Sequence, residues 1–470
     1  MNDTWLKVWS WHNLRVASAV QERLRRRFTK AGQAVLAATL SAALFGLDTR
    51  MTAAYQAFAF GAALLLVGAL GTLRRKPTLT SERRLPRHAT VGEPCSYRVT
   101  LRNTGHRPLA ALELAERLPD PRPSRALFLA ARAPLEVRLN PVERLFGYPR
   151  WEWLVRQGRA AEPQSAVPLP TLSPGEQIEQ TFRITPTRRG WLRLDALVAA
   201  RTDVLGLMRR ETPLPGSDRL LVLPKRYPVA PLPQPSHRRL QPGGVNLASA
   251  VGDSREFMGL RDYLPGDSPR HIHWAVWARS GEPVVKEYQD EFFSRQALIL
   301  DTFQDGGPVA SAAPEAAYTG CDPVFECAIS VAASLVEPLT RAGAAQDALL
   351  DLMFVADRAH TVTGGRGLLS GDGMLEVLAC LEPNRDRHFT SLSELVLSRT
   401  PQLSAAICVL LAWDEPRQDL VQRLHALGLP LRILLITTSV SASIAESGTS
   451  PPPLCIDPAD PAAGLAWDQD

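Results

Sequence analysis

The chain has 470 residues, of which 45% are hydrophobic and 21% are charged, and its formal net charge at pH 7 is +5. This is the composition of a globular protein with an ample core, and it excludes a disordered or fibrous chain. At roughly 150 residues per domain, the length predicts about two or three domains.

Residues 1–30 predict a basic, amphipathic N-terminal arm. The stretch 21–30, QERLRRRFTK, carries five basic residues and one acidic residue. A basic helix with tryptophan on its apolar face settles at the headgroup boundary of a membrane. An ordinary soluble tail is the alternative. Five apolar side chains fall near one face of the predicted helix: Trp5, Trp9, Val16, Val20 and Leu24.

Residues 31–73 predict a two-helix transmembrane hairpin. The segments 31–47 and 53–73 are apolar and carry no charge. As helices they would reach about 25 and 31 Å, against about 30 Å for the hydrocarbon core of a bilayer. The alternative is a buried hairpin in a soluble protein.

The basic flanks of this hairpin predict its orientation. Five basic residues precede it within 21–30, and Arg74, Arg75 and Lys76 follow it, whereas the connecting loop holds only Asp48 and Arg50. The positive-inside rule then places both termini in the cytoplasm. The six cysteines form no C-x-x-C pair, which agrees with reduced thiols in that compartment. Adjacent spans also favour anionic lipid over nucleic acid as the partner of the basic run.

Residues 80–225 predict a β-sandwich of the immunoglobulin-like kind. Short alternating runs such as CSYRVTLRNTG are separated by turn residues, and a helical pattern interrupts them only around 141–158. Residues 226–250 are rich in proline and glycine without apolar periodicity, which predicts an extended linker.

Residues 251–470 predict an α/β domain. From about residue 296, short apolar runs alternate with helical patterns, which is typical of a parallel sheet covered on both faces. Ligands of such sheets lie beyond the carboxyl ends of the strands, where Asp301, Asp305 and Asp414 are predicted. Carboxylates there suit Mg²⁺, but acidic residues at these positions also cap the following helices. Both interpretations stay open.

The segment 255–288, which begins REFMGLRDYLPGDSPRHIHWAVWARS, concentrates charges of both signs among aromatic rings. Arg255 next to Glu256, Arg261 next to Asp262 and Asp267 near Arg270 invite pairing, because arginine and carboxylate form bidentate bonds. A strand over 270–275 would place His271 and His273 on one side. The segment is either a strap held by ion pairs or a docking surface that exposes some of its arginines.

This segment resembles the signature of the bacterial family called domain of unknown function 58, R-E-F-x-G-L-R-x-Y-x-x-G-D-x-x-R-x-I-x-W-x-x-x-A-R. The stretch RRGWLRLDALVAARTDVLGL at 188–207 is similar to the end of the β-domain of that family, with Val204 where proline is usual. The resemblance covers the whole chain. It marks ten signature residues as structural or partner-binding: Arg255, Glu256, Gly259, Arg261, Tyr263, Gly266, Asp267, Arg270, Trp274 and Arg279.

The resemblance implies a membrane-anchored multidomain protein of the bacterial inner membrane, whose last domain is similar to von Willebrand factor A domains. Members are commonly encoded beside MoxR-type AAA+ ATPases, so the implied role is a non-enzymatic adaptor that works with such an ATPase on a client protein that the sequence does not indicate. The alternative is a metal-dependent hydrolase at the cytoplasmic membrane face. A metal-binding von Willebrand factor A domain carries D-x-S-x-S, whereas residues 301–305 here are DTFQD, without either serine.

Overall fold

A computed structural model describes residues 2–45, 52–72, 77–131, 140, 146–162, 164–230, 241–242, 255–265, 267, 269–290, 292–303, 322–341, 348–365, 368–384, 388–437 and 452–466. The chain divides into two compact units, with the boundary between Pro224 and Lys225.

The first unit begins with three helices: α1 (Asn2–Arg27), α2 (Lys30–Phe45) and α3 (Thr52–Thr72). The predicted apolar segments 31–47 and 53–73 thus coincide with α2 and α3. These two helices pack closely, because a Cβ on Gly61 would lie 2.2 Å from the Thr39 hydroxyl. That hydroxyl donates to the Val35 carbonyl oxygen at 2.7 Å, so the polar group in this apolar hairpin is satisfied.

A β-domain follows, as the alternation over 80–225 predicted. Three small sheets, with strand orders β1-β3-β6, β2-β10-β7 and β5-β4-β8-β9, surround one apolar core that includes Val99, Leu114 and Leu194. The strands are β1 (Leu79–Arg84), β2 (His88–Thr90), β3 (Cys95–Asn103), β4 (Leu112–Arg117), β5 (Val167–Leu169), β6 (Gln177–Ile184), β7 (Gly190–Leu194), β8 (Ala196–Thr202), β9 (Arg209–Pro213) and β10 (Asp218–Leu223).

Two short helices interrupt the β-domain and support α1. Helices α4 (Arg125–Ala130) and α6 (Tyr148–Gly158) form a small apolar cluster around Phe128 and Trp151, against which Trp11 and Leu14 of α1 pack. The Trp11 indole N–H also donates to the Pro123 carbonyl oxygen at 3.3 Å. The helical pattern predicted around 141–158 is therefore α6.

One buried ion cluster joins the three sheets of the β-domain. Arg83 of β1 makes two bonds to Glu116 of β4, at 2.8 and 3.2 Å, and one to Asp218 of β10 at 2.8 Å. The Tyr97 hydroxyl of β3 donates to the same Glu116 at 2.8 Å. The side chains of Arg83 and Glu116 are each only 2% exposed, so neither charge can be solvated by water.

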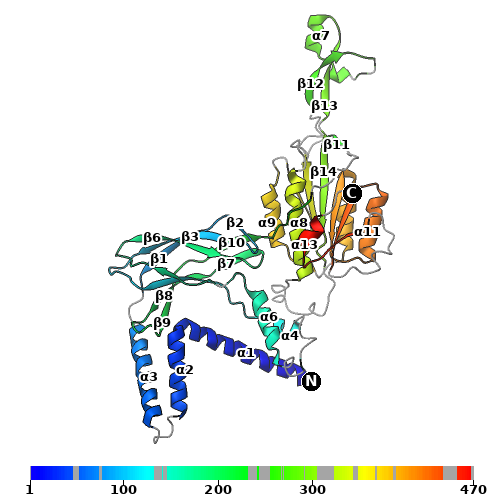
Figure 1. The fold of residues 1–470 in the computed structure, drawn as a ribbon. Coiled ribbons are helices and arrows are strands. Elements are labelled where there is room, and N and C mark those ends of the chain that lie inside the picture. The colour runs from blue at the N-terminus through cyan, green and yellow to red at the C-terminus, as the bar shows by residue number, and fades with distance from the viewer. Residues whose placement is uncertain are drawn as a thin grey trace. The chain divides into compact units, whose positions relative to one another are not determined.

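The second unit contains an α/β domain (Figure 1). Its sheet has the strand order β16-β15-β14-β17-β18-β19. All neighbours in this order are parallel except β15 and β16. The strands are β14 (Phe292–Leu300), β15 (Ala348–Val355), β16 (Ala359–Gly364), β17 (Ala405–Leu410), β18 (Leu431–Ile436) and β19 (Leu454–Ile456). The helices are α8 (Pro323–Arg341), α9 (Gly371–Cys380), α10 (Thr390–Arg399), α11 (Glu415–Ala426) and α13 (Pro461–Leu465).

The start of the predicted linker belongs to the α/β domain. The backbone N–H of Tyr227 donates to the Ser334 hydroxyl at 2.8 Å, and that of Ala230 donates to the Leu465 carbonyl oxygen at 3.1 Å. Strand β11 (Gln241–Pro242) pairs with β14. The described parts of the predicted extended linker over 226–250 are therefore hydrogen-bonded to the α/β domain at these points.

Candidate functional site

The signature segment folds as a hairpin with a structured tip. Strands β12 (Arg255–Asp262) and β13 (Val284–Asp290) form a two-stranded antiparallel sheet of their own. Between them lie a short 3-10 helix, η2 (Pro269–His271), and α7 (Trp274–Ser280). Gly281, at φ 78°, ends α7 in the left-handed conformation that favours glycine. Figure 1 shows α7 at the closed end of the hairpin.

An ion pair between Arg261 and Asp267 holds the tip together. The guanidinium donates twice to the carboxylate, at 2.8 and 2.7 Å, and Asp267 also accepts the backbone N–H of Leu264 at 2.9 Å. The side chains are 37% and 19% exposed, so the pair is partly shielded from water. The sequence placed Arg261 beside Asp262 and Asp267 near Arg270; the structure pairs Arg261 with Asp267, and Arg261 also donates to the backbone carbonyl oxygen of Asp262 at 3.2 Å.

The predicted strand over 270–275 is also wrong. His273 is the N-cap of α7, and its Nδ1 accepts the backbone N–H of Val276 at 3.3 Å. Its backbone N–H donates to the Val284 carbonyl oxygen at 2.8 Å, which ties α7 to β13. His273 therefore has a structural role at a helix start.

The tip exposes large apolar side chains next to arginines. Trp274 is 61% exposed and stacks on Trp277, with ring centroids 5.3 Å apart. Leu264 is also 61% exposed, and Arg270 and Arg279 are exposed. Exposed tryptophan and leucine beside arginine are typical of an interaction surface.

The other signature residues have backbone roles where they are described. Arg255, Glu256 and Gly259 lie on β12, where the register shifts between Phe257 and Gly259. The backbone N–H of Tyr263 donates to the Pro283 carbonyl oxygen at 3.0 Å and closes the hairpin. Gly266 lies outside the described residues.

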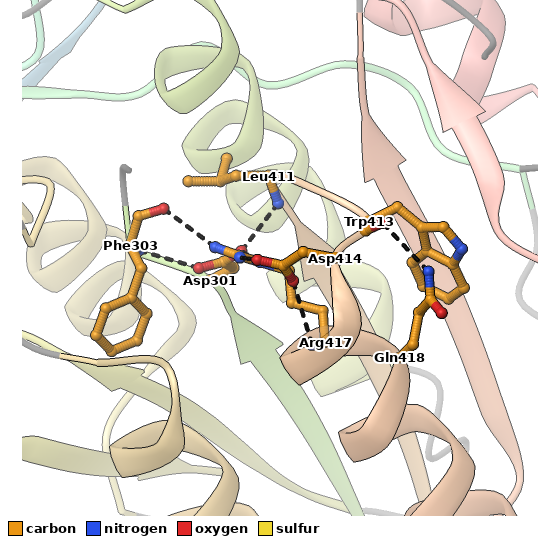
Figure 2. A network of polar contacts seen from close by, with 7 residues as sticks. All are labelled: Asp301, Phe303, Leu411, Trp413, Asp414, Arg417 and Gln418. Atoms are coloured by element: carbon orange, nitrogen blue, oxygen red, sulfur yellow. Dashed lines mark hydrogen bonds and ion pairs between the residues drawn. The ribbon is translucent and has the colours of Figure 1, made fainter. Parts of the chain in front are cut away.

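The carboxylate site of the α/β domain lies at the carboxyl ends of β14 and β17, as predicted (Figure 2). Asp301, the residue after β14, is fully buried. One of its oxygens accepts the backbone N–H of Phe303 at 3.0 Å, and the other accepts that of Leu411 at 3.0 Å. Both carboxylate oxygens thus have backbone donors.

A guanidinium lies between the two carboxylates. Arg417 donates through Nε to Asp301 at 2.6 Å, through Nη1 to Asp414, and through Nη2 to the Phe303 carbonyl oxygen at 3.3 Å. Its side chain is 2% exposed, and its Cζ lies 4.8 Å from the centre of the Phe389 ring. Asp414 is also the N-cap of α11, which is the capping alternative that the sequence left open.

These residues do not fit a divalent cation. Asp301 and Asp414 both form ion pairs with Arg417. A metal ion would have to displace this buried guanidinium from both carboxylates. In the parts of the chain that the structure describes, no group of three or more His, Cys, Asp or Glu could hold a metal ion. Asp305 lies outside the described residues. The hypothesis of a metal-dependent hydrolase gains no support from this geometry.

Burial sets the electrostatics of the site. Removal from water raises the pKa of the Asp301 carboxyl, and Arg417 with the two backbone donors opposes that rise. Arg417 was not among the site residues predicted from the sequence. The signal that points to it is a cation in the first turn of α11, where the helix dipole disfavours positive charge unless a carboxylate offsets it.

Two helices in the described part of the chain are long and apolar enough to cross a membrane by length and composition. One is Ala53–Thr72 in α3, with a mean hydropathy of 1.8 and 11% of its residues buried. The other is Pro323–Thr340 in α8, with a mean hydropathy of 1.3 and 61% of its residues buried. Helix α8 packs against β14 and β15, so it is a core helix of the α/β domain. Helix α2 is a shorter apolar helix.

No family model matches the chain, and no curated protein matches it. Among solved structures, the CARDB domain of a Pyrococcus furiosus protein is 15% identical, covering 31% of this chain and 89% of that one, at a TM-score of 0.17. Proximal thread matrix protein 1 from the mussel byssus, solved with a zinc-occupied MIDAS motif, is 10% identical. The match covers 37% of this chain and 46% of that one, at a TM-score of 0.27. At these TM-scores the likenesses carry no argument about fold or function.

Proposed function

We propose that this protein is a membrane-anchored adaptor of the domain of unknown function 58 family and that the tip of its β12–β13 hairpin docks a MoxR-type AAA+ ATPase. The observation that carries the proposal is a braced tip with an exposed Trp274. A tip that served only as a strap would bury its aromatic rings, whereas this one leaves Trp274 61% exposed.

The chemistry of the tip suits a protein partner. Tryptophan and arginine are the residue types that contribute most to binding at protein interfaces. The Arg261–Asp267 ion pair fixes the turn before any partner arrives, which lowers the entropy lost on binding. Arg270 and Arg279 add positive charge, so the complementary surface of the ATPase is apolar at its centre and acidic at its rim.

The fold supports the rest of the proposal in outline. Within this proposal, we assign the β-domain to the immunoglobulin-like sandwiches and the α/β domain to the von Willebrand factor A-like folds. Arg417 pairs with both Asp301 and Asp414, which is consistent with a domain that serves as a scaffold for the hairpin without a metal ion.

Membrane anchoring by α2 and α3 completes the proposal. The exposed apolar face of α1 then lies on anionic lipid, because its opposite face packs on α4 and α6. Five apolar residues on that face are at least one-third exposed: Trp5, Trp9, Val16, Val20 and Leu24. Both termini are cytoplasmic.

Replacing Trp274 by alanine should weaken ATPase binding strongly. The loss at an exposed tryptophan in the centre of an interface is about 2–4 kcal/mol, roughly 30- to 1,000-fold in Kd. The measurement is the Kd of the full-length protein in lipid nanodiscs for the MoxR-type ATPase encoded in the same genome. Leu427→Ala is the matched control, because Leu427 is 49% exposed on the same unit but outside the hairpin. Equal binding by wild type and Trp274→Ala would refute docking at the tip.

Labelling of intact cells tests the anchor. A cysteine introduced at Arg50 should react with a membrane-impermeant maleimide from outside, because the loop between α2 and α3 is then extracytoplasmic. Native Cys380, which is exposed on the α/β domain, should react only after permeabilisation. Labelling of Cys380 in intact cells would contradict the orientation.

A further inference from the structure

The turn between β8 and β9 is built around Asp203. The backbone N–H of Asp203 donates to the Met208 carbonyl oxygen at 2.9 Å, and the backbone N–H of Met208 donates back to the Asp203 carboxylate at 2.9 Å. Gly206, at φ 70°, provides the left-handed residue that the turn requires. The four residues between Asp203 and Met208 are therefore held in one conformation.

This turn contacts the first residues of α2. The backbone N–H of Thr29 donates to the Leu207 carbonyl oxygen at 3.0 Å, and the Thr29 hydroxyl donates to that of Gly206 at 2.5 Å. A Cβ on Gly32 would lie 1.9 Å from the Leu207 oxygen, so glycine is required for the approach. The turn thus lies beside the start of α2, at the same height along the axis of that helix.

The same turn contacts the last residues of α3. A Cβ on Gly68 would lie 2.9 Å from the Asp203 carboxylate, and Arg210 of β9 donates to the Thr72 carbonyl oxygen at 2.8 Å. Gly68 precedes Thr72 by one helical turn, about 6 Å along the axis. The turn therefore lies beside the apolar hairpin and reaches about one helical turn inward from the C-terminal end of α3.

Two apolar side chains project from the turn at this level. Val204 is 76% exposed and Leu205 is 43% exposed, although Leu207 beside them is buried. If α2 and α3 span the bilayer, the last turn of α3 and the first turn of α2 mark the cytoplasmic membrane boundary. Val204 and Leu205 then lie where headgroups meet acyl chains, the depth at which apolar side chains leave water for lipid.

We infer that the β8–β9 turn is a lipid-contacting element, in which Val204 and Leu205 insert into the cytoplasmic leaflet beside the helix hairpin. The inference rests on the proposed anchoring by α2 and α3. The exposed face of α1 would be a second contact with the same leaflet. The β-domain would then be fixed to the membrane by two contacts besides the spanning helices.

Depth-dependent fluorescence quenching tests this inference. Cysteines are introduced one at a time at Val204, at Leu66 in α3 and at Glu93 of full-length protein carrying Cys380→Ser, and are labelled with an NBD fluorophore. The signal of the labelled parent, which keeps the other native cysteines, is subtracted. Leu66 is 63% exposed and reports on anchoring. Glu93 lies in the turn before β3 and serves as the control position. The other end of β3, at Asn103, pairs with Leu79, the first residue of β1, which follows α3. The protein is placed in vesicles that contain lipids with a doxyl quencher near the headgroup.

The inference predicts that the probe at position 204 loses most of its emission to the headgroup-level quencher, while the probe at position 93 is unaffected. Quenching at position 66 without quenching at position 204 would overturn the inference and leave the anchoring intact. An unquenched probe at both positions would reject the anchoring itself. A probe at position 204 that is shielded from aqueous iodide but not quenched by doxyl lipid would show that protein covers the turn, and this too would overturn the inference.

Discussion

Replacing Arg417 by alanine should lower the free energy of unfolding of the α/β domain by about 3–5 kcal/mol, because Asp301 would be left as an uncompensated buried charge. Asp301 is fully buried, and the Arg417 guanidinium pairs with it at 2.6 Å. The measurement is thermal or urea unfolding of the full-length protein in detergent. A loss of this size is a large part of the usual 5–15 kcal/mol of a domain.

The matched control is Arg423→Ala on the same helix. Arg423 pairs with Asp419 at 2.9 Å, but the two side chains are 59% and 50% exposed, so the expected cost is about 0–1 kcal/mol. An Arg417→Ala protein as stable as Arg423→Ala would contradict the structural role of the buried guanidinium.

The stability of Arg417→Ala should also depend on pH. Burial raises the pKa of Asp301, and in the variant the main opposing charge is gone. The folded state then holds a proton that the unfolded state releases, so the variant is most stable at acidic pH and loses stability as the pH rises towards and through the folded pKa.

Replacing Glu116 by alanine should cost the β-domain about 3–5 kcal/mol, because Arg83 would lose its bidentate partner inside the core. Arg83 is 2% exposed and keeps its bonds to Asp218, whose side chain is 43% exposed, and to the Gly216 carbonyl oxygen. The Tyr97 hydroxyl also loses its acceptor. The measurement is again the unfolding midpoint of the full-length protein.

Glu179→Ala is the control for this prediction. Glu179 pairs with Arg98 across β3 and β6, but the side chains are 49% and 66% exposed. Its removal should change the unfolding free energy by no more than about 1 kcal/mol. If Glu116→Ala unfolded no more easily than Glu179→Ala, the ion cluster would not be what joins the three sheets.

Much of the fold could be predicted because it depends on local periodicity. The apolar runs at 31–47 and 53–73 are α2 and α3, and the alternation after residue 296 gave a mostly parallel sheet. Helix α10 was not predicted, since its apolar residues are not confined to one face: Leu395 and Leu397 stand beside the buried Val396. Helix α7 was taken for a strand, because aromatic and histidine residues carry no clear helical period.

The candidate sites were predictable in position but not in partners. The carboxyl ends of adjoining parallel strands bring Asp301 and Asp414 together, as the strand rule requires. Their partner Arg417 is 116 residues from Asp301 along the chain, and pairing across such a distance has no periodic signal. The Arg261–Asp267 pair was missed for a similar reason, because it depends on the shape of a turn.

Our central claim is that the Arg417 guanidinium, and no metal ion, neutralises Asp301 and Asp414. The most direct test is the unfolding midpoint of the full-length protein in EDTA, in Mg²⁺ and in Mn²⁺. A cation that binds the folded state must raise this midpoint in proportion to its binding free energy. We predict that the three unfolding curves of the wild-type protein coincide. A midpoint that rises with Mg²⁺ or Mn²⁺, and that no longer rises in Asp414→Asn, would contradict the claim.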